Sequence, residues 1–251
     1  GLDVIPSVAA GERRDALLAT SDSSAEPSLD LFYKITPSLT GSLTINTDFS
    51  ATEVDDRQVN LSRFALFFPE KRTFFLQDAD IFEFGRIDEN GRPFFSRRIG
   101  LGRLGEIVDI EGGGKISGRI GRFNIGMLSI RQDASLLADA DNSTVARISA
   151  NVLPESTLGF IVTEGSPQSL LDNSVVGTDF LYRNTRLPGG RVLEAEVWAQ
   201  QSDTEGLRGD DMAYGFGVSS PNETGLRGGM RYTVFEERFN PGLGFVNRVG
   251  V

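Results

Sequence analysis

The chain has 251 residues, a formal net charge of −10, and neither histidine nor cysteine. This acidic balance argues against a nucleic-acid partner, because phosphate binding needs clustered Lys and Arg. The missing residue types exclude disulfides, thiolate nucleophiles, Ser-His-Asp catalysis and the commonest zinc ligands, so any catalysis would rest on carboxylates, Tyr, Lys or Arg.

No apolar run approaches the roughly 20 residues that a transmembrane helix needs. The start at Gly1-Leu2-Asp3 lacks the basic and apolar regions of a signal peptide. Two settings therefore stay open: a cytosolic protein, or a mature or trimmed piece of an exported one.

The first strands are expected before residue 50. Residues 2–8 are a short strand candidate, residues 9–27 are polar and are predicted to be a loop, and residues 28–36 alternate in hydrophobicity. Residues 39–49 alternate most clearly, which is typical of a β-strand. A run of this length matches the roughly 9–11 residues with which a tilted strand crosses a bilayer.

Residues 50–101 interrupt this pattern. Phe side chains are dense here, charged residues lie between them, and neither strict alternation nor a long helical stripe persists. We predict one short helix over residues 55–68, ended by Pro69, and a turn at residues 88–91. We interpret the segment as a compact insert that packs inside or against a β-structure built by the rest of the chain.

Residues 102–251 are predicted to form a β-meander. Strand patterns recur here between short turns, such as Gly121-Arg122 and residues 154–156, and longer acidic loops, such as residues 133–142. A last strand is expected to begin at Asn240.

Three parts are thus expected within a single β domain: first strands at 1–49, the insert at 50–101 and the meander at 102–251. Its strands carry apolar or aromatic residues on one face and Gly, Ser, Thr or charge on the other. In a soluble β-sandwich the apolar faces form a shared core. In an outer-membrane barrel they face lipid instead, and the polar faces line the lumen.

Strand length, the Gly and Ser content of the polar faces, and the contrast between long loops and short turns favour the barrel. The predicted fold class is therefore all-β. It is an antiparallel meander that forms all or part of a transmembrane β-barrel, with a short helical or irregular insert at about 50–100.

Several blocks of sequence carry a resemblance to a known family. In the insert they are Asp48-Phe49-Ser50, Val54-Asp55-Asp56, Gln58-Val59-Asn60-Leu61-Ser62-Arg63-Phe64, Leu66-Phe67-Phe68-Pro69-Glu70-Lys71-Arg72 and Phe74-Phe75-Leu76. Later ones are Phe95-Ser96-Arg97-Arg98-Ile99-Gly100-Leu101 and Asn240-Pro241-Gly242-Leu243-Gly244-Phe245. The chain resembles an uncharacterised family of Gram-negative outer-membrane β-barrel proteins, most specifically over residues 39–101. Thr73 stands where the family pattern has Pro, and Gln77-Asp78 stand where it has Glu-Gly.

The resemblance implies a location in the outer membrane of a Gram-negative bacterium, with outer-membrane lipid as a partner. Members usually carry an N-terminal module similar to family 9 carbohydrate-binding modules, so the full-length protein is expected to have one before this segment. The barrel is expected to continue past Val251.

No established activity follows from the resemblance. The expected function is passage or binding of a solute, with a saccharide as one candidate, and no catalytic residue or cofactor is predicted. The alternative is a soluble carbohydrate-binding or carbohydrate-active β-protein, whose insert builds a sugar site from carboxylates and aromatics.

One group of candidate site residues consists of charged side chains expected to hold the insert in place. A charge left unpaired in a water-poor lumen is costly, so partners are expected; the alternative is an ordinary surface charge run. For the two adjacent arginines, binding of an anionic solute or lipid headgroup is a further alternative. The group comprises Asp55, Asp56, Arg63, Glu70, Lys71, Arg72, Arg97 and Arg98.

The other candidates are possible ligand-binding residues. Asp78, Asp80 and Glu83 supply oxygens of the kind that bind a hard cation. The alternative is solvated or Arg-paired carboxylates; no calcium-loop pattern follows them, so no metal is predicted. Trp198 is a candidate for stacking on a sugar, for an interfacial aromatic girdle or for the core. Glu194 and Glu196 share one strand face, which suggests lumen lining more than a catalytic acid pair.

Overall fold

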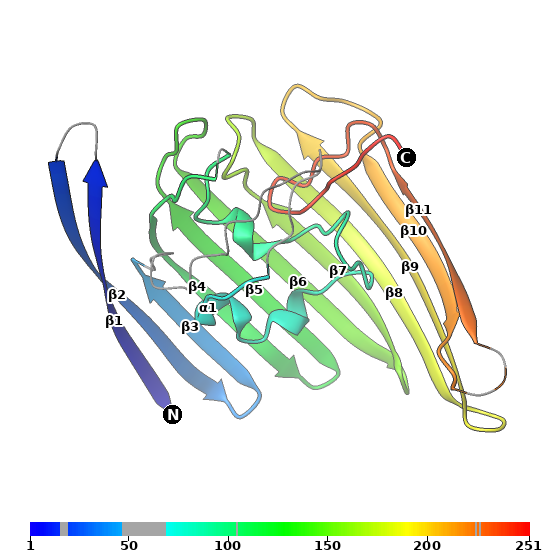
Figure 1. Ribbon diagram of the computed structural model, residues 1–251. Helices are drawn as coiled ribbons and strands as arrows, with labels where there is room; N and C mark the ends of the chain where they lie inside the picture. The colour runs from blue at the N-terminus through cyan, green and yellow to red at the C-terminus, as the bar shows by residue number, and fades with distance from the viewer. Residues whose placement is uncertain (16–19, 47–68, 104, 224, 226) are drawn as a thin grey trace.

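The computed structural model describes residues 1–15, 20–46, 69–103, 105–223, 225 and 227–251, and for residues 9–15 and 20–26 it describes the backbone only. One antiparallel sheet holds all the described strands in sequence order (Figure 1). The strands are β1 (Leu2–Asp15), β2 (Thr20–Thr36), β3 (Leu39–Ile45), β4 (Ile110–Ile120), β5 (Phe123–Gln132), β6 (Asp141–Leu153), β7 (Ser156–Glu164), β8 (Asn173–Leu187), β9 (Arg191–Thr204), β10 (Met212–Ser220) and β11 (Gly228–Phe235). The predicted all-β antiparallel meander is confirmed.

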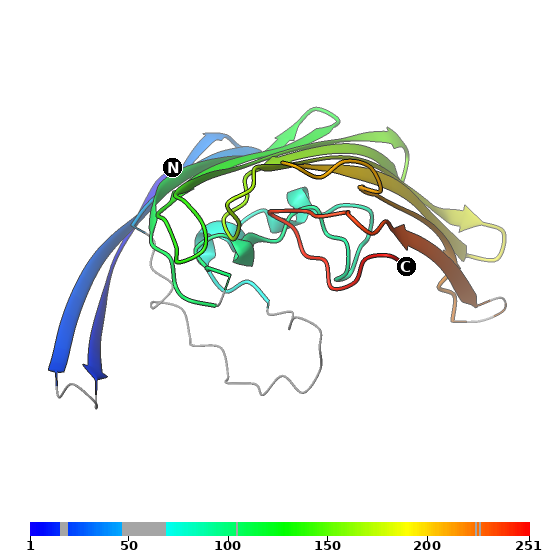
Figure 2. The ribbon, with the colours of Figure 1, turned by 90° about the horizontal axis from the view of Figure 1, so that it is seen from above.

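The sheet is strongly curved, which gives it a convex and a concave face (Figure 2). Within the described part of the chain, β1 and β11 each pair along one edge only, so the sheet is an open arc. The helix predicted over residues 55–68 lies outside the described residues.

The first hairpin is longer than predicted. Most of residues 9–27, predicted to be a loop, belong to β1 and β2, which pair without interruption from Leu2 opposite Tyr33 to Asp15 opposite Thr20. The prediction was wrong because it rested on side-chain composition, whereas the pairing of two hairpin strands satisfies backbone groups whatever the side chains are.

Connections at the two ends of the sheet differ in length. Tight turns lie at one end (37–38, 121–122, 154–155 and 188–190), together with one longer connection (221–227), and longer loops lie at the other end (133–140, 165–172 and 205–211). The chain between β3 and β4 also leaves and returns at the long-loop end, because Ile45 lies opposite Gly112 in the strand register.

The convex face of the sheet is apolar. Phe160, Val197 and Phe216 are 46%, 51% and 45% exposed, although their strands lie in the interior of the sheet. No second sheet covers this face in the described chain. Other exposed apolar or aromatic residues of the convex face, from β3 to β11, are Leu43, Ile45, Ile116, Met127, Ile148, Leu158, Val176, Tyr214, Val218, Met230 and Tyr232.

The concave face is mixed, which only partly matches the polar face predicted from sequence. Buried polar and charged residues lie on it, among them Lys115, Ser117, Arg147, Asp179 and Gln200. Between them lies an apolar patch, because this part of the face is covered by the insert. The patch contains Leu128, Ile130, Val145 and Ile161.

The described part of the insert lies against the concave face (Figure 2). Its path is irregular and includes only single-turn helices: α1 (Thr73–Leu76), η1 (Ala79–Phe82) and η2 (Ser96–Arg98). We call residues 69–103, together with residues 240–251, the covering layer. Dense Phe and charge without a repeating period explain why no longer helix or strand forms here.

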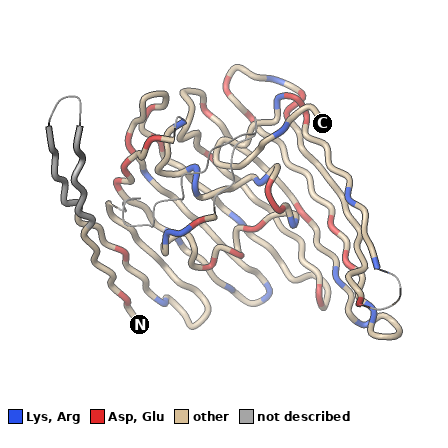
Figure 3. The backbone as a smooth tube through the Cα atoms, viewed as in Figure 1, with Lys and Arg blue, Asp and Glu red and all other residues tan. Residues whose placement is uncertain are grey.

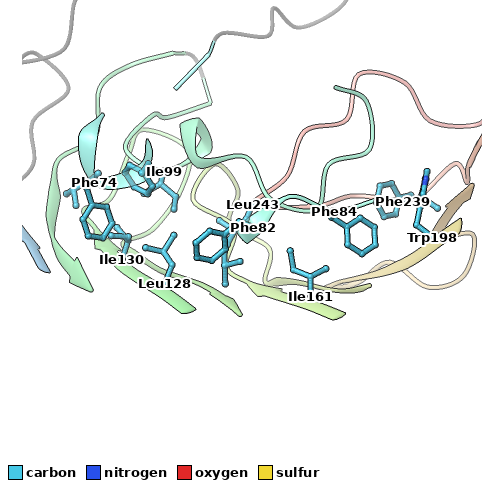
Figure 4. Close-up of a cluster of buried hydrophobic side chains, with 14 of the residues drawn as sticks. Phe74, Phe82, Phe84, Ile99, Leu128, Ile130, Ile161, Trp198, Phe239 and Leu243 are labelled. Carbon is cyan, nitrogen blue, oxygen red and sulfur yellow. The ribbon is translucent and has the colours of Figure 1, made fainter. Parts of the chain in front are cut away.

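The hydrophobic core lies between the covering layer and the sheet (Figure 4). Phe82 occupies the space above Gly126 of β5, where an added Cβ would lie 2.8 Å from the ring. Phe84 lies above Gly177 of β8 in the same way, at 2.9 Å. These strand glycines therefore let the insert approach the sheet backbone closely. The core consists of Phe74, Phe75, Phe82, Phe84 and Ile99 of the insert, Ile110, Leu128, Ile130, Val145, Ile161, Trp198, Ala213 and Phe235 of the sheet, and Phe239 and Leu243.

The strand expected to begin at Asn240 does not form, and that prediction was wrong. Residues 240–251 instead cross the concave side as irregular chain (Figure 1). The amide of Gly91 donates to the Phe245 carbonyl at 2.8 Å, and the amide of Phe95 donates to the Leu243 carbonyl at 2.8 Å. Pro241 lacks the amide donor that a continuing ladder needs. Backbone groups of Leu243 and Phe245 bond to the insert instead, and those of Gly250 and Val251 bond to Phe235.

Candidate functional site

Arg72 is the centre of an ion pair and of several hydrogen bonds within the insert. Its side chain is 2% exposed and pairs with Glu70 through two bonds, Nε to Oε1 at 2.9 Å and Nη2 to Oε2 at 2.7 Å. The guanidinium also donates to the carbonyls of Ser96 at 2.8 Å and Ile99 at 3.0 Å, and it lies 4.0 Å from the ring centre of Phe75. These contacts tie the residues before α1 to η2.

Burial and pairing act in opposite directions on Glu70. Burial raises the pKa of its carboxyl, but the hydrogen bonds and the positive charge of Arg72 lower it, and the net pKa lies below the ordinary value of 4.5. Ser96 Oγ adds a hydrogen bond to Glu70 Oε2 at 2.6 Å. The carboxylate is therefore ionised and held in place at neutral pH, which suits a structural role rather than proton transfer.

The other predicted members of the network have separate partners. Arg97 donates to the Pro69 carbonyl at 3.2 Å, and the backbone amide of Lys71 donates to Glu70 Oε1 at 3.0 Å. Arg98 donates to the Gly244 carbonyl at 2.7 Å and to Gln168 Oε1, and burial lowers the pKa of its guanidinium. Arg98 therefore joins η2 to the C-terminal segment and to the 165–172 loop. Asp55, Asp56 and Arg63 lie outside the described residues.

Asp78 and Lys115 attach the middle of the insert to β4. Asp78 Oδ2 accepts a hydrogen bond from Ser117 Oγ at 2.6 Å, and Lys115 Nζ donates to the carbonyls of Phe74 and Gln77. Asp78 has φ 54° and ψ 30°, a left-handed conformation. This is the position where the resembled family has Gly, so the turn keeps the backbone that Gly favours, and the Asp side chain adds a bond to the sheet.

Asp80 and Glu83 are exposed, and the structure does not bring them together with Asp78 as a cation site. No group of three or more potential metal ligands occurs among the described residues. Trp198 lies in the core beneath the insert, where its side chain packs against Phe84 and Phe235 with ring centres 6.3 and 6.1 Å apart.

A buried ion pair that the sequence did not reveal lies under the insert. Arg147 of β6 and Asp179 of β8 form two bonds of 2.6 and 2.9 Å across the intervening strand. Asp179 Oδ2 also accepts a hydrogen bond from the Gly85 amide at 3.0 Å, and Arg147 lies 5.4 Å from the ring centre of Phe84. The pair thus fixes the insert to the centre of the sheet. Alternation could place both residues on the concave face, but not opposite each other.

A cleft of about 840 Å³ lies between the insert and the last three strands. Its aromatic side is contributed by the insert and contains Phe75, Phe82, Phe94 and Phe95. Its charged side includes Glu194 and Glu196 of β9 and Arg231 of β11. We call this feature the insert cleft.

The charges of the insert cleft form pairs across distant parts of the chain. Arg231 Nε donates to Glu196 Oε1 at 2.8 Å, and Arg231 Nη1 lies 3.4 Å from Asp88 Oδ2. Glu194 accepts from Arg86 at 3.0 Å and pairs with Arg183 at 3.3 Å. The sequence predicted that both glutamates share one strand face, and both line the cleft on the concave side of the sheet. Their three arginine partners were missed, because each lies in the insert or on another strand, and alternation within one strand does not identify such a partner.

These features define the class: an all-β chain in which one curved antiparallel sheet carries an insert on its concave face and exposes an apolar convex face. A family model described as a domain of unknown function, DUF5916, matches residues 2–117. That range takes in β1 to β3, the insert and most of β4, and it is consistent with the uncharacterised family that the sequence resembles. No curated protein and no solved structure matches the chain. Among the residues that the structure describes, no helix is long and apolar enough to cross a membrane.

Proposed function

We propose that the chain is part of a β-barrel protein of a Gram-negative outer membrane, in which the sheet forms part of the wall. The convex face meets lipid, the concave face meets the lumen, and the covering layer narrows that lumen. In this role the protein binds or passes a small solute through the insert cleft.

The observation that carries the proposal is the apolar convex face. Soluble proteins rarely expose contiguous apolar patches beyond a few hundred Å². Here, Phe160, Val197 and Phe216 lie on adjacent or nearby interior strands, and each is nearly half exposed. The same strands bury Arg147, Asp179 and other polar groups on their opposite face. An outer-membrane barrel has this distribution of apolar and polar residues.

The ends of the sheet support the same proposal. Outer-membrane barrels have short periplasmic turns and longer extracellular loops. The connections of the sheet follow this division except for residues 221–227, a longer connection at the tight-turn end. Charged residues lie at strand ends, in the covering layer and at some positions within the strands (Figure 3). The insert begins and ends at the long-loop end, so in this proposal it enters the lumen from the extracellular side.

The test uses Trp198, the one tryptophan in the chain. The protein is reconstituted into vesicles with phospholipids brominated along their acyl chains, which quench tryptophans in contact with hydrocarbon. The wild type is expected to show little quenching, because Trp198 is 3% exposed and faces the insert. A Trp198→Phe/Phe160→Trp variant, with its tryptophan on the convex face, is expected to be strongly quenched.

Two outcomes contradict the proposal. One is equal, weak quenching at both positions in vesicles. The other is a wild-type protein that stays monomeric and folded in buffer without detergent or lipid, as the soluble carbohydrate-binding alternative requires. Circular dichroism of both proteins is the control for correct folding.

A further inference from the structure

The insert cleft has two chemically different sides. Phe82 and Phe94 pack together with ring centres 5.7 Å apart, and Phe94 and Phe95 are only partly buried. Facing them, β9 and β11 contribute carboxylate and guanidinium groups. A ligand that fits both sides therefore needs an apolar face and several hydrogen-bonding groups.

The charges on the polar side are already paired. Arg231 lies between Glu196 and Asp88, and Glu194 lies between Arg86 and Arg183. An ionic ligand would gain little net attraction from such a wall, and it would have to compete with an existing pair. A neutral ligand keeps the pairs intact and can still donate to the carboxylates and accept from the guanidinium groups.

The carboxylate of Glu196, on the polar side of the cleft, is held in one orientation in which it can accept a hydrogen bond from a ligand. Glu196 has a side chain that is 6% exposed, and Arg231 Nε fixes its Oε1 at 2.8 Å. In the described part of the chain, Glu196 Oε2 makes no further hydrogen bond, although Glu196 lines the cleft. An oriented carboxylate oxygen of this kind is a strong acceptor for a ligand hydroxyl.

We infer that the insert cleft binds a neutral, polyhydroxylated ring compound, that is, an uncharged saccharide. Its hydroxyl groups bond to Glu196, Glu194 and Arg231, and the apolar face of a sugar ring packs on Phe94 or Phe95. The cleft volume of about 840 Å³ lies in the upper part of the range of roughly 300–1,000 Å³ typical of ligand pockets, so a short oligosaccharide fits better than a single ring. The inference rests on the proposed function only in taking the cleft as the solute site.

The inference places the ligand away from Asp78, Asp80 and Trp198, three of the four ligand-binding candidates from the sequence, whereas the fourth, Glu83, lines the insert cleft. Asp78 is bonded to Ser117, and Trp198 is covered by Phe84 and Phe235. The cleft residues were harder to find, because the insert and β9–β11 lie about a hundred residues apart in the chain.

The experiment is calorimetry of the detergent-solubilised protein with matched trisaccharides. Maltotriose and cellotriose are the neutral probes, trigalacturonate is the anionic probe and chitosan trimer is the cationic probe. At least one neutral probe is expected to bind at least about tenfold more tightly than either charged probe, the factor that 1.4 kcal/mol produces.

Variants test the role of the paired charges. Glu196→Gln keeps the size of the side chain but leaves Arg231 with less compensation. The variant is expected to bind the neutral trisaccharides about tenfold more weakly, because they lose a hydrogen bond to a charged group. It is expected to bind trigalacturonate more tightly. Phe94→Leu is expected to weaken the binding of every saccharide probe. Glu223→Gln in the β10–β11 connection and Phe216→Leu on the convex face are the matched controls, expected to change nothing.

Three results would overturn the inference. The first is no measurable heat of binding for either neutral probe, the second is tighter binding of a charged probe, and the third is unchanged selectivity between neutral and charged probes in folded Glu196→Gln. Trp198 emission shows that each variant is folded. The outcome is separable from the proposed membrane role. A soluble protein that binds neutral sugars would refute the membrane role alone, and a lipid-quenched protein with flat calorimetry would refute the saccharide alone.

Discussion

Replacement of Arg72 tests whether the insert is held by its internal ion pair. Glu70 has a side chain that is only 11% exposed in the wild type. In Arg72→Ala it loses both of its guanidinium bonds, and the carbonyls of Ser96 and Ile99 lose their donor. Removing one partner of a buried pair costs about 3–5 kcal/mol, because the other charge stays buried without compensation. For a chain of this size, that loss lowers Tm by about 6–20 °C.

The matched control is Arg191→Ala, at the exposed start of β9. Its expected effect is within about 0.5 kcal/mol. The assay is urea unfolding followed by Trp198 fluorescence, under the conditions in which the wild type is monodisperse. Equal shifts in the unfolding midpoint of the two variants would refute the reasoning.

The pH dependence of the unfolding free energy shows whether the pairing of Glu70 with Arg72 is stabilising. In the wild type the Glu70 pKa is lowered, so the stability that it contributes is present above the unfolded value near 4.5 and is lost as pH falls through the folded value. In Arg72→Ala, the carboxylate of Glu70 keeps the Ser96 hydroxyl and the backbone amides of residues 71 and 72 as donors but loses the guanidinium bonds and charge, so the Glu70 pKa is higher than in the wild type. The difference in unfolding free energy between variant and wild type should therefore shrink as pH falls from 7 to 4. Glu70→Gln should relieve part of the Arg72→Ala loss, and additive effects in this double-mutant cycle would contradict the pairing.

Three more predictions concern the attachment of the insert to the sheet. Gly177→Ala places a Cβ 2.9 Å from the Phe84 ring and should cost about 1–3 kcal/mol in unfolding free energy. In Gly114→Ala the Cβ would lie 3.3 Å from the end of Leu43 and 3.7 Å from the Ser42 carbonyl, so this control should be neutral or slightly stabilising. Asp78→Ala should destabilise more than Asp78→Gly in the same assay, because both lose the bond to Ser117 but only Gly relieves the left-handed backbone; the reverse order would contradict this account. Lys115→Met should speed tryptic cleavage within the insert, because the carbonyls of α1 lose their anchor on β4, and an unchanged cleavage rate would argue against that anchor.

Local sequence determined the strands of this protein. Period-two alternation depends only on the pleat of a single strand, so β3 at residues 39–45 and most strands between 102 and 235 could be assigned from sequence. The same alternation predicted that Glu194 and Glu196 face one way and Val197 the other. It failed at residues 9–27, where backbone pairing rather than side-chain pattern makes the strand.

Only the tertiary structure decided how the insert meets the sheet. The contacts of Phe84 with Gly177, of Gly85 with Asp179 and of Arg86 with Glu194 each join residues about a hundred positions apart. Glycine on the polar face of a strand was the one local indication of these contacts, since it marks a place where another chain segment can approach closely. It does not indicate which segment approaches.

The C-terminal segment shows the same limit. Its sequence after Asn240 looks like the start of a strand, yet its backbone bonds to Gly91 and Phe95 of the insert. The hydrogen-bond partners of these backbone groups depend on which chain segment lies nearest in space. No local sequence pattern shows which segment that is. The strands were thus readable from the chain itself, whereas the covering layer and its cleft depend on long-range contacts that exist only after folding.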